Sequence, residues 1–279
     1  TGKTTIAAHT AHYLAKKHQN IEYIDCDVEE PNGHFFLKPK WNQESPVFSD
    51  NPEINKEICT GCGKCAEICQ FNAIICLNKN AMAFSELCHS CGGCSLVCPV
   101  QAITYKKNQI GTIHYGKSGN IDFYQGLLQI GKAMSPPLIR ELKKKSKNIS
   151  YSIFDCPPGA SCPAVESIRD SDYVILVTEP TPFGLNDLKI SIDMVRELKV
   201  PFGIFINRFD LGNNETEEYC QKENIPIIGR IPNDRKIAYL YSKGSLFTEE
   251  IPDYENVFAQ MMKQIENFLI TQQPTEYKE

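Results

Sequence analysis

The chain has 279 residues, 42% hydrophobic and 23% charged, a composition typical of a globular protein with room for one large domain and one small one. Its formal net charge of −5 disfavours nucleic acid as the main partner, because phosphate backbones attract basic surfaces. The sequence has no apolar run long enough for a membrane span, and its cysteine runs indicate a reducing compartment, so we expect a cytoplasmic protein.

The chain opens with a Thr-Gly-Lys-Thr-Thr run followed by apolar residues at helical spacing. This pattern is typical of the end of a phosphate-binding loop, although so short a motif is a weak signal alone. In such a loop Gly2 and Thr5 lie beside the phosphates, Lys3 contacts the β- and γ-phosphates, and the Thr4 hydroxyl binds Mg²⁺. The usual first glycine and preceding strand are absent, so we expect a fragment whose missing strand belongs in the middle of the sheet.

A short apolar strand at 21–24 leads into Asp25-Cys26-Asp27. Carboxylates at the carboxyl end of a parallel strand lie where ligands bind in open α/β sheets. Asp27 is therefore a candidate to orient a water molecule or a hydrated Mg²⁺. A turn or helix-capping aspartate explains the same pattern equally well at this point.

One cysteine pattern is written twice between residues 59 and 103, and the second copy follows the first by 29 residues. Its spacing is that of the bacterial ferredoxin run, in which the fourth cysteine ligates the partner cluster. The spacing therefore predicts two [4Fe–4S] clusters, the first held by Cys59, Cys62, Cys65 and Cys98 and the second by Cys88, Cys91, Cys94 and Cys69.

Zinc and disulfides are the alternatives for these eight cysteines. Zinc favours separated cysteine pairs over four cysteines in one run, and the regular spacing needs no oxidising compartment to explain it. Prolines at 39, 46 and 52 mark the entry to a small α+β ferredoxin-like insert, placed at 50–110 between two parts of a larger domain at 1–49 and 111–279. So small an insert depends on its clusters for much of its folding free energy.

Beyond the insert, strand-like runs at 112–115 and 121–130 precede a helix from Pro136 to about Lys147. Tyr151–Asp155 is then a buried strand followed by Cys-Pro-Pro-Gly, the pattern of a strand that places Asp155 near Mg²⁺ and Gly159 near a γ-phosphate. Cys156 and Cys162 permit a redox interpretation, but small buried thiols beside a turn are the simpler one.

Further apolar strands at 173–178, 202–207 and 225–231 alternate with helices, and Arg208 follows the second of them. This alternation predicts an α/β fold with a doubly wound, mainly parallel sheet. Several strands end in a polar residue at one edge: Asp25, Asp155, Thr178 and Asn207. A last amphipathic helix at 253–270 carries acidic residues on its polar face, so we expect it to pack on the sheet rather than on a membrane.

Together these residues resemble the MinD/ParA/Mrp superfamily of P-loop ATPases, and specifically its branch with an inserted ferredoxin domain. The resemblance rests on 1–5, Asp-Cys-Asp-Val-Glu-Glu-Pro-Asn at 25–32, the cysteine runs, 155–159, Thr-Glu-Pro-Thr-Pro-Phe-Gly at 178–184 and Ile-Asn-Arg at 206–208. It implies ATP hydrolysis, an ATP-dependent homodimer, a base-binding Asn207 beside Arg208, and a signature lysine upstream of Thr1.

Three functions are compatible with this resemblance. The first is an ATPase that couples nucleotide state to electron transfer with an unknown redox or metalloprotein partner. The second is a carrier or maturation factor that delivers a metal cluster, although closed sets of four cysteines favour retention. The third, a positioning protein of the MinD kind, is disfavoured by the acidic terminal helix.

Overall fold

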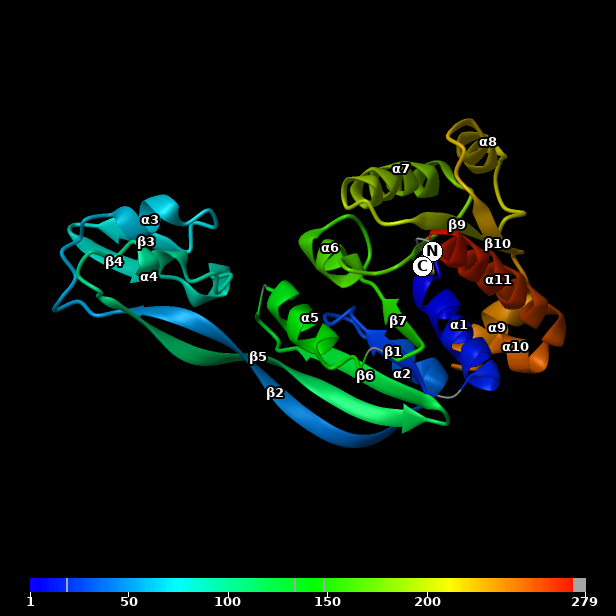
Figure 1. Ribbon diagram of the computed structural model, residues 1–279, viewed down its shortest axis with the longest axis horizontal. Helices are drawn as coiled ribbons and strands as arrows, with labels where there is room; N and C mark the ends of the chain where they lie inside the picture. The colour runs from blue at the N-terminus through cyan, green and yellow to red at the C-terminus, as the bar shows by residue number, and fades with distance from the viewer. Residues whose placement is uncertain (19, 133, 148, 273–279) are drawn as a thin grey trace, which may run out of the picture.

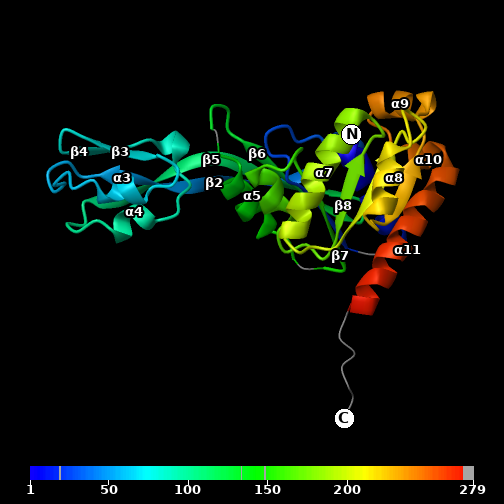
Figure 2. The ribbon, with the colours of Figure 1, turned by 90° about the horizontal axis from the view of Figure 1, so that it is seen from above.

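The computed structural model describes residues 1–18, 20–132, 134–147 and 149–272, and it has an α/β body and a small lobe (Figures 1 and 2). We call residues 55–102 the lobe. The lobe is joined to the body by a ribbon made of two long antiparallel strands, β2 (Lys40–Ile54) and β5 (Ile103–Ser118). The described residues outside the lobe and the ribbon form the body.

The body alternates strands with helices, as predicted. Its strands are β1 (Ile21–Asp25), β6 (Ile121–Leu128), β7 (Tyr151–Asp155), β8 (Val174–Thr178), β9 (Phe202–Asn207) and β10 (Ile227–Ile231). Its helices are α1 (Lys3–Lys17), α2 (Gly33–Leu37), α5 (Pro136–Lys143), α6 (Cys162–Ile168), α7 (Pro182–Glu197), α8 (Glu215–Lys222), α9 (Arg235–Ser242), α10 (Phe247–Glu250) and α11 (Glu255–Gln272), with short 3₁₀ turns at Ser85–Leu87 in the lobe and Pro252–Tyr254.

The strands form two sheets in the orders β2-β5-β6-β1-β7 and β10-β9-β8. Strands β6, β1 and β7 are mutually parallel, and so are β8, β9 and β10, whereas β5 runs antiparallel to both of its neighbours. The prediction of an α/β fold with a mainly parallel sheet is confirmed. A cavity of about 560 Å³ lies between the edges of β7 and β8, lined by Tyr151, Ile153, Ile175 and Val177 among others.

Helices cover both faces of the sheets because successive side chains on a strand point to opposite sides. On β1, Tyr23 packs in a core with α1 and α11, whereas Ile24 packs in a second core with α5. On β9, Phe205 belongs to the first core, while Ile204 packs against α7 and α8 in a third. The sheet is therefore doubly wound.

The ribbon is longer than the sequence pattern indicated. Its strand β5 is continuous from Ile103 to Ser118 and pairs with β2 from Lys40 to Ile54, so the boundaries expected at 50 and 110 fall inside the ribbon. The strand-like signal at 112–115 marks only the part of β5 that also pairs with β6. The remainder carries polar residues at 106–109 and lacks the apolar alternation of a half-buried strand.

Helix α11 packs on the body, as predicted. Phe258, Met261 and Ile265 of its apolar face lie in the core shared with α1 and β10, and Met262 joins them. Among the described residues, no helix is both long and apolar enough to cross a membrane.

His9 connects α1 to the C-terminal helices from a fully buried position. Its Nδ1 lies 2.7 Å from the Thr5 carbonyl oxygen, its Nε2 accepts the backbone N–H of Phe247 at 2.9 Å, and its ring stacks on that of Phe247. Burial lowers the pKa of His9 to about 3, so the imidazole stays neutral with Nδ1 as the donor.

His9 should therefore make stability depend on pH. The unfolded state binds a proton below the ordinary histidine pKa of 6.5, while the folded state does not until about pH 3, so stability falls as pH decreases through this range. Between pH 8 and pH 5, the free energy of unfolding of the wild type should fall by about 2 kcal/mol more than that of His9→Gln, as measured by urea unfolding. Equal losses in the two proteins would contradict this assignment.

Candidate nucleotide site and cysteine centres

The start of α1 is shaped as a site for an anion. Gly2 has a φ of 86°, and its carbonyl accepts the first helical hydrogen bond, from Ile6. A Cβ on Gly2 would lie 2.6 Å from Nδ2 of Asn207, and this amide donates to the carbonyl of Thr1 at 3.1 Å. The first turn carries no acidic residue, so its free N–H groups and positive helix end are available to phosphate.

Two carboxylates end adjacent strands beside this helix. Asp25 and Asp155 are register partners on β1 and β7, and the Tyr23 hydroxyl donates to Oδ2 of Asp155 at 2.7 Å. Burial raises the pKa of Asp155 to about 6, and hydrogen bonds from Tyr23 and Thr4 and the charge of Lys3 act against that rise. Thr4 and Lys3 therefore stand next to Asp155, as expected for a Mg²⁺-phosphate site.

Asp27 shares this environment. Burial raises its pKa, the backbone N–H of Glu30 and the charge of Lys3 lower it, and the side chain is half-buried. Lys3 thus lies within electrostatic reach of both candidate carboxylates. The structure brings Asp27, Asp155 and the start of α1 to one edge of the sheet.

Asp25 has a role that the sequence pattern alone did not separate from that of Asp27. Its buried carboxylate accepts backbone N–H groups from Asp27 at 3.3 Å, Asn32 at 3.1 Å and Gly33 at 2.9 Å. We call residues 27–33 the nucleotide loop, and Asp25 organises it from beneath. A Cβ at Gly33 would overlap the Tyr23 ring, so this close approach requires glycine. The sequence feature that could have revealed this role of Asp25 was its position at the end of a fully buried strand.

The other residues predicted at this edge do not all join the site. Arg208 has a φ of 54° and forms an ion pair with Glu179 at 3.6 Å, beside Asn207. Gly159 lies in the loop after β7 with a φ of 79°, with open space around its Cβ position. Thr178 donates its hydroxyl to the Gly184 carbonyl at 3.1 Å, so it supports the start of α7 instead of joining the site.

The two halves of the lobe are built alike. Helices α3 (Lys64–Ile68) and α4 (Gly93–Leu96) each begin after a glycine of nearly equal φ, 79° at Gly63 and 80° at Gly92. Strands β3 (Ile74–Leu77) and β4 (Asn80–Ala83) form a hairpin between them. The Cys69 and Cys98 sulfurs each accept a backbone N–H four residues later, at 3.3 and 3.2 Å. The sequence repeat is thus also a structural repeat.

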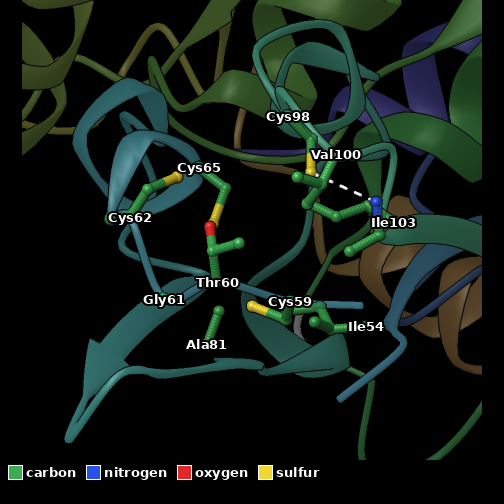
Figure 3. Close-up of a pocket in the computed structure, with 12 residues that line it drawn as sticks. Ile54, Cys59, Thr60, Gly61, Cys62, Cys65, Ala81, Cys98, Val100 and Ile103 are labelled. Carbon is green, nitrogen blue, oxygen red and sulfur yellow. Dashed lines mark hydrogen bonds between the residues drawn. The ribbon is translucent and has the colours of Figure 1, made fainter. Parts of the chain in front are cut away.

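The first predicted cysteine set lines one cavity of about 20 Å³ (Figure 3). Cys59, Cys62 and Cys65 come from the first run, and Cys98 reaches the same cavity from the second. Apolar side chains such as Ile54 and Ile103 complete its wall. Four cysteine sulfurs around an apolar cavity are a donor set suited to a [4Fe–4S] cluster.

The other three cysteines of the second predicted set lie within electrostatic reach of Cys88. Burial raises the pKa of the Cys88 thiol, and the charges of Cys94, Cys91 and Cys69 raise it further. The Tyr105 hydroxyl lies 2.9 Å from Ser95 Oγ and 3.6 Å from the Cys94 sulfur. In the part of the chain that the structure describes, no three metal-binding side chains converge on one ion. A four-iron cluster contacts each cysteine through a different iron, so its ligands need not converge.

The cysteines outside these sets have separate environments. Cys26 and Cys220 are fully buried, and burial raises the pKa of the Cys156 thiol to about 12, which keeps it protonated and unreactive. The Cys156 side chain is half-buried, so the buried-thiol interpretation fits it only in part. It is wrong for Cys162, which is exposed because it begins α6 at the surface.

A family model described as "CobQ/CobB/MinD/ParA nucleotide binding domain" matches residues 1–247. An uncharacterized protein of Methanocaldococcus jannaschii is 28% identical over 97% of the chain and 94% of its own length. An iron-sulfur cluster carrier protein of Rickettsia bellii is 31% identical over 45% of the chain and 41% of its own length. The septum site-determining protein MinD of Pyrococcus horikoshii, solved with Mg-ADP, has a TM-score of 0.57 and 17% identity over 96% of this chain and 91% of its own.

The cysteine sets can be tested by counting iron. We expect about eight irons per chain after anaerobic reconstitution, and Cys98→Ser should perturb the cluster of the first set although it lies in the second run. Cys76→Ser is the matched control, because Cys76 lies in the same lobe, donates weakly to the Gly61 carbonyl and belongs to neither set. Stoichiometric zinc without iron would contradict the ferredoxin interpretation.

Proposed function

Since the chain belongs to the CobQ/CobB/MinD/ParA nucleotide-binding family, we propose that it is an ATPase that couples ATP binding and hydrolysis to electron transfer by two [4Fe–4S] clusters. The observation that carries the proposal is the joint presence of a phosphate-binding helix start and two sets of four cysteines in one chain. The lobe at 55–102 is inserted between Asp27 and Asp155, the two carboxylates nearest the expected γ-phosphate.

At the nucleotide edge each residue has a proposed role. Gly2 and Thr5 present N–H groups to phosphate, Lys3 contacts the β- and γ-phosphates, and Thr4 binds Mg²⁺ with Asp155 in support. Asp27 orients the attacking water, and Gly159 approaches the γ-phosphate when its loop closes. Asn207 and Arg208 face the base. The Mg-ADP in the similar MinD of P. horikoshii supports this assignment.

The body also accommodates the phosphate-loop strand that the sequence pattern predicts in the middle of the sheet. The cavity between β7 and β8 is bordered by two parallel edges, and α1 begins at its end with Lys3 among the lining residues. One more parallel strand would pair with both edges and join the two sheets into one.

In the lobe, the proposed ligand sets are Cys59, Cys62, Cys65 and Cys98 for one cluster, and Cys88, Cys91, Cys94 and Cys69 for the other. The clusters supply one-electron storage when bound. The chain holds the cysteines in place and donates backbone N–H groups to the Cys69 and Cys98 sulfurs. We propose a cytoplasmic protein that forms an ATP-dependent homodimer and passes electrons to a redox or metalloprotein partner.

The second candidate is an iron-sulfur or metallocofactor carrier. It is favoured by the similarity to the iron-sulfur cluster carrier protein of R. bellii, which matches less than half of this chain. The two candidates differ in what happens to the cluster, because a carrier must release it and an electron carrier must retain it. Transfer of iron to an apo-ferredoxin in the presence of ATP, with loss of iron from this protein, would favour the carrier.

The nucleotide site can be tested in the full-length protein. Lys3→Ala should weaken ATP binding at least about tenfold, because a charge-assisted hydrogen bond contributes ~1.5–3 kcal/mol. Lys17→Ala removes an exposed lysine from the far end of the same helix and is the matched control for calorimetric titration. ATP affinity that is equal in the two variants would remove Lys3 from the site.

Asp27→Asn should bind ATP normally and hydrolyse it ~10²-fold more slowly, as expected when a group that positions the nucleophile is lost. Glu30→Gln, an exposed carboxylate of the same loop, should retain the wild-type rate. Phosphate release under single-turnover conditions separates the two steps. A wild-type rate in Asp27→Asn would exclude the proposed role.

The coupling predicts that nucleotide changes the cluster potentials. By linkage, a tenfold difference in ATP affinity between redox states, about 1.4 kcal/mol, corresponds to about 60 mV for a one-electron couple. Potentiometric titration followed by EPR in the apo, ADP and non-hydrolysable-ATP states should reveal the shift, and Lys3→Ala should abolish it. Equal potentials with ATP bound would favour the carrier.

A further inference from the structure

The start of helix α5 contacts the nucleotide loop. Ser135, which caps α5, is 2% exposed, and its hydroxyl donates to Oε1 of Glu29 at 3.0 Å. Glu29 itself is exposed, so its carboxylate can leave or regain this hydroxyl without burying a charge. This hydrogen bond can therefore break and re-form at little cost in free energy, which is required of a contact that transmits a change of state.

A second contact attaches the same loop to the strand before α5. The Val28 carbonyl accepts the N–H of Leu128 at 2.8 Å, and a Cβ at Gly126 would lie 2.5 Å from the Val28 side chain. Strand β6 ends at Leu128, and residues 129–135 lead from it to α5. A shift of the nucleotide loop therefore acts on both ends of this connection.

The same connection touches the lobe. Lys132, Met134 and Pro137 of the body line a cavity of about 10 Å³ together with Glu86 and Cys88 of the lobe. A cavity of this size holds at most about one water molecule, so the two surfaces lie close together here. Lys132 and Glu86 carry opposite charges, which favours the contact.

We infer that Ser135 is a positioning residue that transmits the state of the nucleotide loop to the second cysteine set. This inference rests on the proposed function and adds a route and a direction to it. When the loop rearranges around the γ-phosphate, Glu29 moves Ser135 and the start of α5, and the start of α5 displaces the segment that carries Cys88. The second set responds, and the first set does not.

The selectivity follows from where the two sets lie. The cavity of the first set is lined by residues of the lobe and by the ribbon ends Ile54 and Ile103, with no contribution from the described residues of the body. The cleft beside Cys88 is lined from both sides. If the ribbon alone carried the signal, both sets would respond, because ribbon residues line the cavity of the first set and also the cavity beside Cys88.

The test is amide hydrogen exchange of the full-length, cluster-loaded protein with a non-hydrolysable ATP analogue and with ADP. In wild type, exchange should differ between the two nucleotides by about tenfold at 84–90 and 135–139, and by less than twofold at 58–64. Ser135→Ala should bind the analogue as tightly as wild type and lose the difference at 84–90. Ser135→Thr, which keeps the hydroxyl, should restore it.

Two further variants make the result decisive. Glu29→Ala removes the other partner from an exposed position and should reproduce the loss even if Ser135→Ala folds poorly. Ser152→Ala is the matched control, since Ser152 donates to the buried Glu22 at 2.8 Å, on β1 away from the nucleotide loop, and should behave as wild type.

The outcomes separate this inference from the proposed function. A wild-type lobe that does not respond to bound nucleotide would refute the coupling itself, and the relay with it. A wild-type response that persists in both Ser135→Ala and Glu29→Ala would leave the coupling intact and overturn the relay. An equal response at 58–64 would overturn the selectivity and assign the signal to the ribbon.

Discussion

The buried carboxylate of Asp25 is the constraint on which the nucleotide edge depends. A carboxylate at the end of a buried strand is costly unless hydrogen bonds satisfy it, and Asp25 obtains three from the backbone of residues 27–33. Those bonds hold Asp27 above the sheet and fix where Val28 and Glu29 project. The candidate catalytic carboxylate and the contact with α5 therefore both depend on one buried side chain.

The lobe is subject to a different constraint, its small size, and it consists of two copies of one unit. Each half is too short to bury a core of its own, and the described apolar core of the lobe is a small cluster around Cys65, Ile74, Ala81 and Ile103. Exchange of the fourth cysteine between halves ties them together, since Cys98 lies with the first run and Cys69 with the second. With the proposed ligand sets, this exchange would make the lobe one cooperative unit rather than two independent loops.

The features that the sequence could predict are those with a local signal. Apolar strands ending in Asp25, Asp155 and Asn207 predicted the sheet and its polar edge. The cysteine spacing predicted two ligand sets, and these sets stay a prediction. The full ribbon escaped prediction because residues 106–109 are polar and pair only through their backbone. Ser135 escaped because its partner Glu29 is distant in sequence and nothing in the local pattern of either residue encodes the contact.

The paired ends of the ribbon have an evolutionary consequence. Ile54 and Ile103 are direct partners across β2 and β5, so the chain leaves for the lobe and returns at the same place. A tight turn in place of the lobe would close the hairpin at little cost in loop entropy. An ancestral ATPase could thus have acquired the lobe as a cassette, in one insertion event, without altering the register of any strand in its sheet.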